Sequence, residues 1–168
     1  QLEALVTPKT KLIFICNPNN PTGTMVTAAD VHAFMQRVPD DAIVVFDEAY
    51  YEYVQDRDFP DSLSWVLQQR NAIILRTFSK IYGLAGLRVG YGLTTPEIAG
   101  YLNRVRPPFN VNTMAQGAAL AALHDDEHVA RSRVLNASEM PTVKAGLVAL
   151  GFQPLPSQAN FLFFDVGR

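Results

Sequence analysis

The chain has 168 residues, 48% of them hydrophobic, and a formal net charge of −2. A chain of this length is typical of one domain with a substantial hydrophobic core. The nearly balanced charge gives no electrostatic reason to expect binding to nucleic acid or to an acidic membrane surface. No apolar run approaches the roughly 18 residues of a membrane span, and the first residues lack the pattern of a secretory leader. The single cysteine, Cys16, excludes an internal disulfide, and we expect a buried thiol in a reducing, cytoplasmic compartment.

The first half of the chain predicts strands that alternate with helices. Apolar runs at residues 11–16, 42–46 and 72–76 lack polar alternation, which is typical of strands buried on both faces. Thr27 is expected to cap a helix that continues to about Arg37. A short helix is expected to begin at Asp61 or Ser62, and a fourth strand is expected at residues 88–93.

Helices dominate the prediction for the second half. Pro96 suits the first turn of a helix that continues to Val105, and an alanine-rich helix is expected at residues 113–123. A longer helical pattern covers residues 127–150, where Pro141 is expected to cause a kink or a break. A last strand is expected at residues 160–166. This order of elements predicts an α/β fold with three layers, in which helices cover both faces of a mostly parallel sheet.

Both ends of the sequence suggest an internal piece of a longer protein. The chain begins with Gln1, enters a strand by residue 11, and closes directly after its last expected strand. A self-contained domain would be expected to continue with a partner or a cap for that strand. We therefore expect the isolated piece to be inactive as an enzyme.

Three polar side chains follow the three buried strands at equivalent positions. Asn20 lies in the turn-forming segment NPNNPTG after the first strand, Asp47 ends the second, and Lys80 follows the third. The carboxyl ends of parallel strands are where open α/β sheets bind ligands. Each residue alone is weak evidence, but the three together predict a binding site at this edge.

The most informative segment is TFSKIYGLAGLRVGYG, residues 77–92, because it surrounds Lys80 with hydroxyl groups and a later arginine. An amine can form a Schiff base with an aldehyde, while hydroxyl and guanidinium groups can hold a phosphate. This combination suggests the phosphorylated aldehyde pyridoxal 5'-phosphate as cofactor. The glycines of the segment do not form a dinucleotide fingerprint, and the three histidines have no partners at metal-ligand spacing, so no metal site is expected.

Several motifs of the chain resemble the fold-type I pyridoxal-phosphate aminotransferases. The resemblance rests on NPNNPTG, DEAY and RTFSKIYGLAGLRVGY, and further on RPPFNVN, AQGAALAAL and PSQANFLFF. It extends over nearly the whole chain and is closest to the histidinol-phosphate aminotransferases of that family. It implies that residues 1–125 form the second half of the large cofactor-binding domain. Residues 126–168 would then form a linking helix and the beginning of a smaller α+β domain.

The resemblance also implies a role for each candidate site residue. Lys80 would be the Schiff-base lysine, Asp47 would pair with the pyridinium nitrogen, and Asn20 and Tyr50 would hydrogen-bond the phenolic oxygen. The cofactor's phosphate would be held by three residues of the lysine segment: Thr77, Ser79 and Arg88.

The implied activity is transamination between histidinol phosphate and 2-oxoglutarate in histidine biosynthesis, by a homodimer. The loop at residues 106–112, with Phe109 among polar side chains, is expected at or near the subunit boundary. The implied partners are a small-molecule amino donor and a 2-oxo acid. An aromatic-amino-acid aminotransferase, a decarboxylase of a phosphorylated amino acid, and a non-catalytic regulator domain of the same fold remain alternatives.

Overall fold

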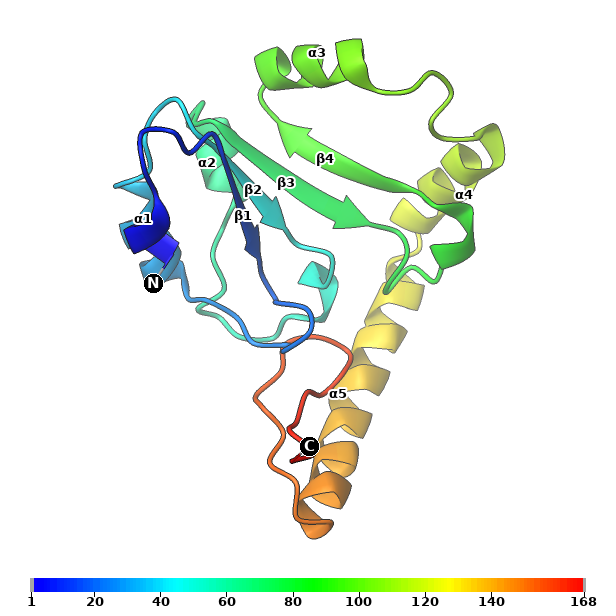
Figure 1. The fold of residues 1–168 in the computed structure, drawn as a ribbon. Coiled ribbons are helices and arrows are strands. Elements are labelled where there is room, and N and C mark those ends of the chain that lie inside the picture. The colour runs from blue at the N-terminus through cyan, green and yellow to red at the C-terminus, as the bar shows by residue number, and fades with distance from the viewer. Residues whose placement is uncertain (1, 168) are drawn as a thin grey trace.

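The centre of the molecule is a four-stranded, mostly parallel sheet. The computed structural model describes residues 2–167. The strands, in spatial order, are β1 (Leu12–Cys16), β2 (Ile43–Asp47), β3 (Ala72–Thr77) and β4 (Gly90–Thr94). The first three run parallel and β4 runs antiparallel to β3 (Figure 1). The predicted α/β class and the four strand positions are therefore confirmed.

Four of the five α-helices in residues 2–167 begin after a side chain that caps them, and the second helix is the exception. The α-helices are α1 (Ala28–Met35), α2 (Leu63–Leu67), α3 (Pro96–Val105), α4 (Thr113–Leu123) and α5 (Asp126–Ala149). The Thr27 side chain accepts a hydrogen bond from the Asp30 amide, 3.2 Å away, and Asn112 caps α4 in the same way. Such contacts satisfy backbone donors that the first helical turn leaves free. Three short 3-10 helices complete the set: η1 (Leu2–Leu5), η2 (Tyr51–Tyr53) and η3 (Ala85–Leu87).

One face of the sheet forms the main hydrophobic core with α1 and α2. Val44, Phe46 and Ile74 from the strands are almost completely buried there against Met35 of α1 and Trp65 of α2. Apolar side chains removed from water in this way supply the largest favourable term in folding. The core therefore fixes β2 and β3, whose carboxyl ends carry the candidate residues.

The opposite face of the sheet is only partly covered by the described residues. Val45 and Ile73 pack there against Ile98 of α3. Leu12 and Phe14 of β1 lie on this face, because they pair with Ile43 and Val45, and are 56% and 61% exposed. We expected helices over both faces of the sheet. Helices α1 and α2 cover one face, whereas α3 covers only the centre of the other.

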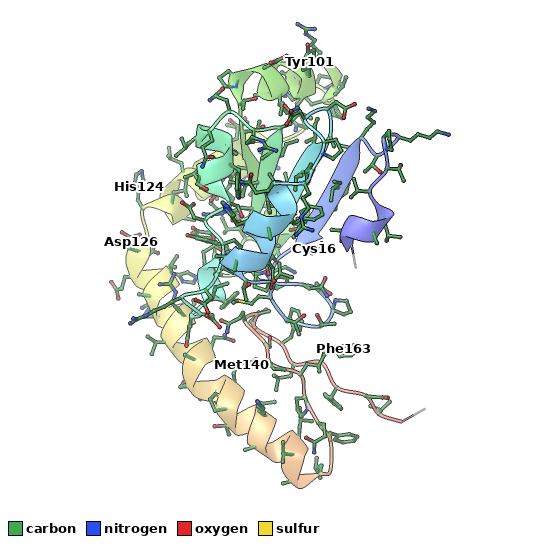
Figure 2. All side chains as sticks on the ribbon, turned by 90° about the vertical axis from the view of Figure 1, so that its left-hand side faces the viewer. Cys16, Tyr101, His124, Asp126, Met140 and Phe163 are labelled. Carbon is green, nitrogen blue, oxygen red and sulfur yellow. The ribbon has the colours of Figure 1, made fainter. Side chains whose placement is uncertain are left out.

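The long helix α5 is hydrogen-bonded through three side chains to the turn after β3, to η2 and to the segment that follows the helix. His128 Nε2 lies 2.9 Å from the Ile81 carbonyl oxygen, Arg133 Nε donates to Glu52 O at 2.8 Å, and Asn136 Nδ2 donates to Ala159 O at 3.3 Å. After α5 the chain turns back beside the helix (Figure 1). Tyr101 on α3 and Met140 on α5 lie far apart along the molecule, with Cys16 at the sheet between them (Figure 2).

Two sequence predictions are wrong in detail, and one of the two alternatives is excluded for a third. Residues 160–166 form no strand, because the backbone hydrogen bond from Leu155 N to Phe163 O, 2.8 Å long, does not continue into a ladder. Pro141 lies inside α5 without ending it, so the predicted break does not occur, and a kink at the proline stays a prediction. Cys16 is exposed, since its side chain points to the partly covered face of the sheet rather than into the core.

Candidate active site

The strand register places the candidate residues along one edge of the sheet. Cys16 pairs with Asp47, and Asp47 pairs with Leu75, so the three parallel strands end nearly level. The connection continues beyond the ladder, where the Asn17 amide donates to Asp47 O at 3.0 Å and the Glu48 amide donates to Leu75 O at 2.9 Å. These backbone bonds confirm the common edge that the sequence predicted.

The loop that carries Asn20 is held from inside by Asn17. The buried Asn17 side chain donates to Val26 O at 3.1 Å and accepts from the Val26 amide at 3.0 Å. At Gly23 the chain adopts a left-handed conformation with φ +75°, and the Gly23 amide donates to Asn19 O at 2.7 Å. The loop is thereby closed, and Asn20 lies exposed at its tip.

Asn20 and Tyr50 are in direct contact. Asn20 Nδ2 donates to the Tyr50 hydroxyl at 3.0 Å. The Tyr50 ring is buried and meets Phe161 edge-on, with 5.2 Å between ring centroids. Phe161 comes from the segment after α5, so this contact joins that segment to the candidate site.

Lys80 faces the same tyrosine. Lys80 Nζ lies 5.1 Å from the centroid of the Tyr50 ring, within the range of a cation–π contact, and the lysine is half-buried. The turn around it is fixed by two backbone amides, from Ser79 to Thr77 Oγ1 at 3.0 Å and from Gly83 to Lys80 O at 2.9 Å. Lys80, Tyr50 and Asn20 therefore form one continuous group.

Asp47 lies beside this group at the end of β2. The residue is half-buried, and its Oδ1 accepts a hydrogen bond from the Ala49 amide at 3.2 Å. Among residues 2–167, no cationic side chain forms an ion pair with Asp47. The Asp47 carboxylate is thus oriented by the backbone amide of Ala49, and β2 places it next to β3, which leads into the lysine segment.

Arg88 lies outside the fourth strand, which begins two residues later than its expected start. It has a left-handed backbone with φ +52°, and its Nη1 donates to Ala85 O at 2.8 Å. The Phe78 amide donates to Val89 O at 3.2 Å, which brings the backbone next to Arg88 alongside the segment that holds Thr77 and Ser79. The exposed guanidinium and the two hydroxyl residues thus belong to neighbouring backbone segments.

The sequence did not reveal a buried ion pair behind this edge. Arg76 Nε and Nη2 lie 3.1 Å and 2.8 Å from Glu48 Oε2, and the Arg76 guanidinium stacks on the Tyr51 ring at 3.4 Å from its centroid. Burial raises the pKa of the Glu48 carboxyl, while the hydrogen bond from Arg76 opposes that rise. Burial likewise raises the pKa of Glu52. The only sequence signals for the pair were an arginine in the apolar run of β3 and a glutamate directly after β2.

Metal binding and membrane spanning find no support in the described part of the chain. No group of three or more histidine, cysteine, aspartate or glutamate side chains in residues 2–167 could hold a metal ion. None of the helices described is both long and apolar enough to cross a membrane.

The fold and the site together define a family. The sequence model of the protein family "aminotransferase class I and II" matches residues 1–168. The chain therefore belongs to this family. It is 53% identical over 168 residues to histidinol-phosphate aminotransferase from Moorella thermoacetica, covering 99% of this chain and 44% of the relative. It is 51% identical to histidinol-phosphate aminotransferase 1 from Nitrosococcus oceani, covering 98% and 45%. The chain thus spans somewhat less than half the length of these curated relatives.

Solved structures agree with the sequence relatives. Histidinol-phosphate aminotransferase from Sinorhizobium meliloti, in complex with pyridoxal-5'-phosphate, superposes with a TM-score of 0.86 at 36% identity. The match covers 94% of this chain and 42% of that structure. A putative histidinol-phosphate aminotransferase from Erwinia carotovora atroseptica gives a TM-score of 0.91 at 31% identity, covering 99% and 48%.

Proposed function

We propose that this chain is part of a longer pyridoxal-phosphate enzyme that transaminates histidinol phosphate with 2-oxoglutarate. The observation that carries the proposal is the contact of Lys80 Nζ with the Tyr50 ring, whose hydroxyl accepts from Asn20, at the strand edge that also holds Asp47. Relatives about 50% identical bear the name histidinol-phosphate aminotransferase, which supports the choice of substrate.

The donor set fits pyridoxal phosphate on chemical grounds. Lys80 offers a half-buried amine that can bond covalently to an aldehyde, and Arg88 offers an exposed guanidinium for a phosphate. Thr77 and Ser79 would add hydroxyl groups to the phosphate contact. When bound, the cofactor acts as a sink for the electron pair left at the substrate α carbon.

The remaining side chains would tune this site. The Asp47 carboxylate would favour a protonated ring nitrogen, because two opposite charges in close contact attract by roughly 4 kcal/mol at an effective dielectric near 20. Asn20 and Tyr50 would donate to the phenolic oxygen and stabilise its negative charge. Once substrate has replaced it, the free Lys80 amine would take the proton from the α carbon and return it as a general acid.

The proposal extends to the organisation of the full-length enzyme. Residues 1–125 would form the second half of the large domain, and residues 126–168 the linking helix and the start of the small domain. We also propose a cytoplasmic homodimer with residues 106–112 at or near the subunit boundary. Phe109 in this loop is 96% exposed, and Arg106 Nη1 donates to Asn110 Oδ1 at 3.0 Å, which supports an ordered loop with apolar surface available for contact.

Chemical trapping tests the cofactor assignment. The full-length protein is loaded with pyridoxal phosphate, reduced with borohydride, digested, and the labelled peptide is identified by mass spectrometry. We expect the label on Lys80. Lys11, which pairs with Asp41, and Lys144 on α5 are internal controls, and label on either of them would overturn the assignment.

A substrate comparison tests the reaction. Transamination is measured with 2-oxoglutarate and either histidinol phosphate or phenylalanine as amino donor. We expect a higher kcat/KM with histidinol phosphate. A preference for phenylalanine would indicate the aromatic aminotransferase instead, and release of carbon dioxide from a phosphorylated amino acid would indicate the decarboxylase.

A further inference from the structure

The ends of β2 and β3 are joined by a buried ion pair next to the candidate site. Two of the three Arg76 side-chain nitrogens, Nη2 and Nε, donate to the same Glu48 oxygen at 2.8 Å and 3.1 Å, and the side chains of Arg76 and Glu48 are 17% and 1% exposed. Glu48 directly follows Asp47, and Arg76 directly precedes Thr77. The pair therefore joins the two backbone segments from which the candidate residues project.

The Arg76 side chain and Asp47 lie on opposite faces of the sheet. Side chains alternate along a strand, so Arg76 shares its face with Ile74 and the core formed by α1 and α2. Asp47 shares its face with Val45, which packs on α3. Because of this alternation, Arg76 can influence the site through the backbone without touching a ligand there.

Tyr51 extends the ion pair to the turn that carries Tyr50. The Arg76 guanidinium lies 3.4 Å from the centroid of the Tyr51 ring, and the Tyr51 amide donates to Glu48 O at 3.0 Å. Tyr50 stands between Glu48 and Tyr51 and turns towards Asn20 and Lys80. The turn that positions the Tyr50 side chain is thus contacted by Arg76 at the residues next to it, Glu48 and Tyr51.

A stability role alone gives a weak account of this arrangement. Replacing a buried ion pair by uncharged residues of similar volume is often neutral or stabilising, because two desolvated charges lose much of what their attraction gains. What a forked guanidinium adds is directional geometry: two hydrogen bonds and a flat surface for stacking.

We propose that Arg76, together with Glu48 and Tyr51, is a positioning unit that sets the separation of Asp47, Tyr50 and Lys80. This inference rests on the proposed function of the site. Arg76 acts through the strand ends, so its loss affects the site more than the fold.

The experiment uses the full-length enzyme and the double variant Glu48→Gln/Arg76→Met. The single variant Arg76→Met would leave Glu48 buried without its partner and could fail to fold, whereas the double variant removes both charges at similar volume. Tyr51→Leu removes only the stacking ring, which is 38% exposed, and serves as a second variant. Val66→Ala is the control, because Val66 is buried in the same core and its truncation lowers stability without removing either charge or the Tyr51 ring.

Four quantities are measured for each protein: the thermal midpoint, the dissociation constant of pyridoxal phosphate, the pH midpoint of the bound cofactor's absorbance, and kcat with KM. For the double variant we expect a thermal midpoint no lower than that of Val66→Ala. We expect a shifted absorbance midpoint and a kcat lower by about a hundredfold, as small misplacements in an active site can cause, with KM changed little. Tyr51→Leu should change the absorbance midpoint and kcat in the same direction by less, and Val66→Ala should leave both near wild type.

Two results would separate this inference from the proposed function. If wild-type protein traps the cofactor on Lys80 but Tyr51→Leu and the double variant match Val66→Ala in absorbance midpoint and kcat, the positioning unit is refuted. If the double variant does not fold, a Tyr51→Leu enzyme with wild-type values refutes it. If wild-type protein traps no cofactor on Lys80, the proposed function itself fails.

Discussion

Asn20 Nδ2 and the Tyr50 hydroxyl lie 3.0 Å apart across two different strand ends, although 30 positions separate the two residues. The contact ties the tip of the NPNNPTG loop to the turn after β2. Lys80 approaches the ring of the same tyrosine, so three separate segments converge on one side chain. This convergence makes the hydroxyl group of Tyr50 a sensitive point for testing the site.

Tyr50→Phe should lower activity with little loss of stability. The phenylalanine ring keeps the edge-on contact with Phe161, and the lost hydrogen bond is worth only about 1 kcal/mol in a typical fold. We expect kcat of the full-length enzyme to fall by roughly tenfold, as a lost interaction of about 1.4 kcal/mol in the transition state would cause. The check is steady-state kinetics with a urea titration on the same samples. Asn20→Ala should be non-additive with Tyr50→Phe, and strictly additive effects would show that the two residues act separately.

Asp47→Asn should inactivate the full-length enzyme while preserving its fold. Loss of an interaction of roughly 4 kcal/mol in the reaction corresponds to about a thousandfold in turnover. Asp58→Asn is the control, because Asp58 is exposed on the loop after η2. Turnover and circular dichroism are compared for the two variants. Near wild-type turnover in Asp47→Asn would assign the role to another acid.

Gly23→Ala should destabilise the loop that carries Asn20. A Cβ at this position would lie 2.3 Å from Ser157 Oγ, and the backbone has φ +75°, where alanine is strained. We expect a loss of about 1–3 kcal/mol from the strained backbone alone. Gly100→Ala is the matched control: it lies inside α3 with no atom within 4 Å of the added carbon, and should be neutral or stabilising by up to about 1 kcal/mol. The measurement is the urea midpoint of unfolding for each variant. Equal losses of stability in Gly23→Ala and Gly100→Ala would contradict the loop geometry.

Glu52→Gln should alter how stability depends on pH. Burial raises the folded-state pKa of Glu52 above its ordinary value of 4.5, so the folded protein holds this proton more tightly than the unfolded chain. The stabilising contribution of the protonated form is therefore complete below pH 4.5 and is lost as the pH rises through the folded-state pKa.

The measurement is the free energy of unfolding of wild type and Glu52→Gln between about pH 4 and pH 8, a range that brackets the ordinary carboxyl titration. The wild-type value minus the variant value should fall with rising pH. Glu139→Gln, at an exposed position on α5, controls for the loss of one charge. A difference that stays constant or rises with pH would contradict a raised pKa at Glu52.

The strands and the common edge of the site could be predicted because their signals are local. Apolar runs such as LIFIC and AIILR identify strands whatever surrounds them, and Thr27 and Pro96 mark helix starts. Parallel order then places Asp47 and the residues after Cys16 and Thr77 at one edge. The roles assigned to those residues remain predictions for the experiments above.

Other features depend on partners that the sequence does not identify. The contact of Arg76 with Glu48 follows from the register of β2 on β3, which no local pattern specifies. Residues 160–166 have the composition of a strand, but a strand requires a neighbour for its backbone hydrogen bonds. The hydrogen bond between His128 and Ile81 joins α5 to the lysine turn across 47 positions, a distance over which side-chain periodicity carries no information.

Three polar side chains of α5, those of His128, Arg133 and Asn136, form hydrogen bonds with the main-chain oxygen atoms of Ile81, Glu52 and Ala159. Every residue type has a carbonyl oxygen, so substitution at the three accepting positions need not remove the hydrogen bonds. Substitution at His128, Arg133 or Asn136 removes them directly. These three hydrogen bonds are therefore specified by the side chains of the helix alone. They tolerate sequence change at the accepting positions as long as the backbone path is kept, whereas the helix has no such freedom at its three donor positions.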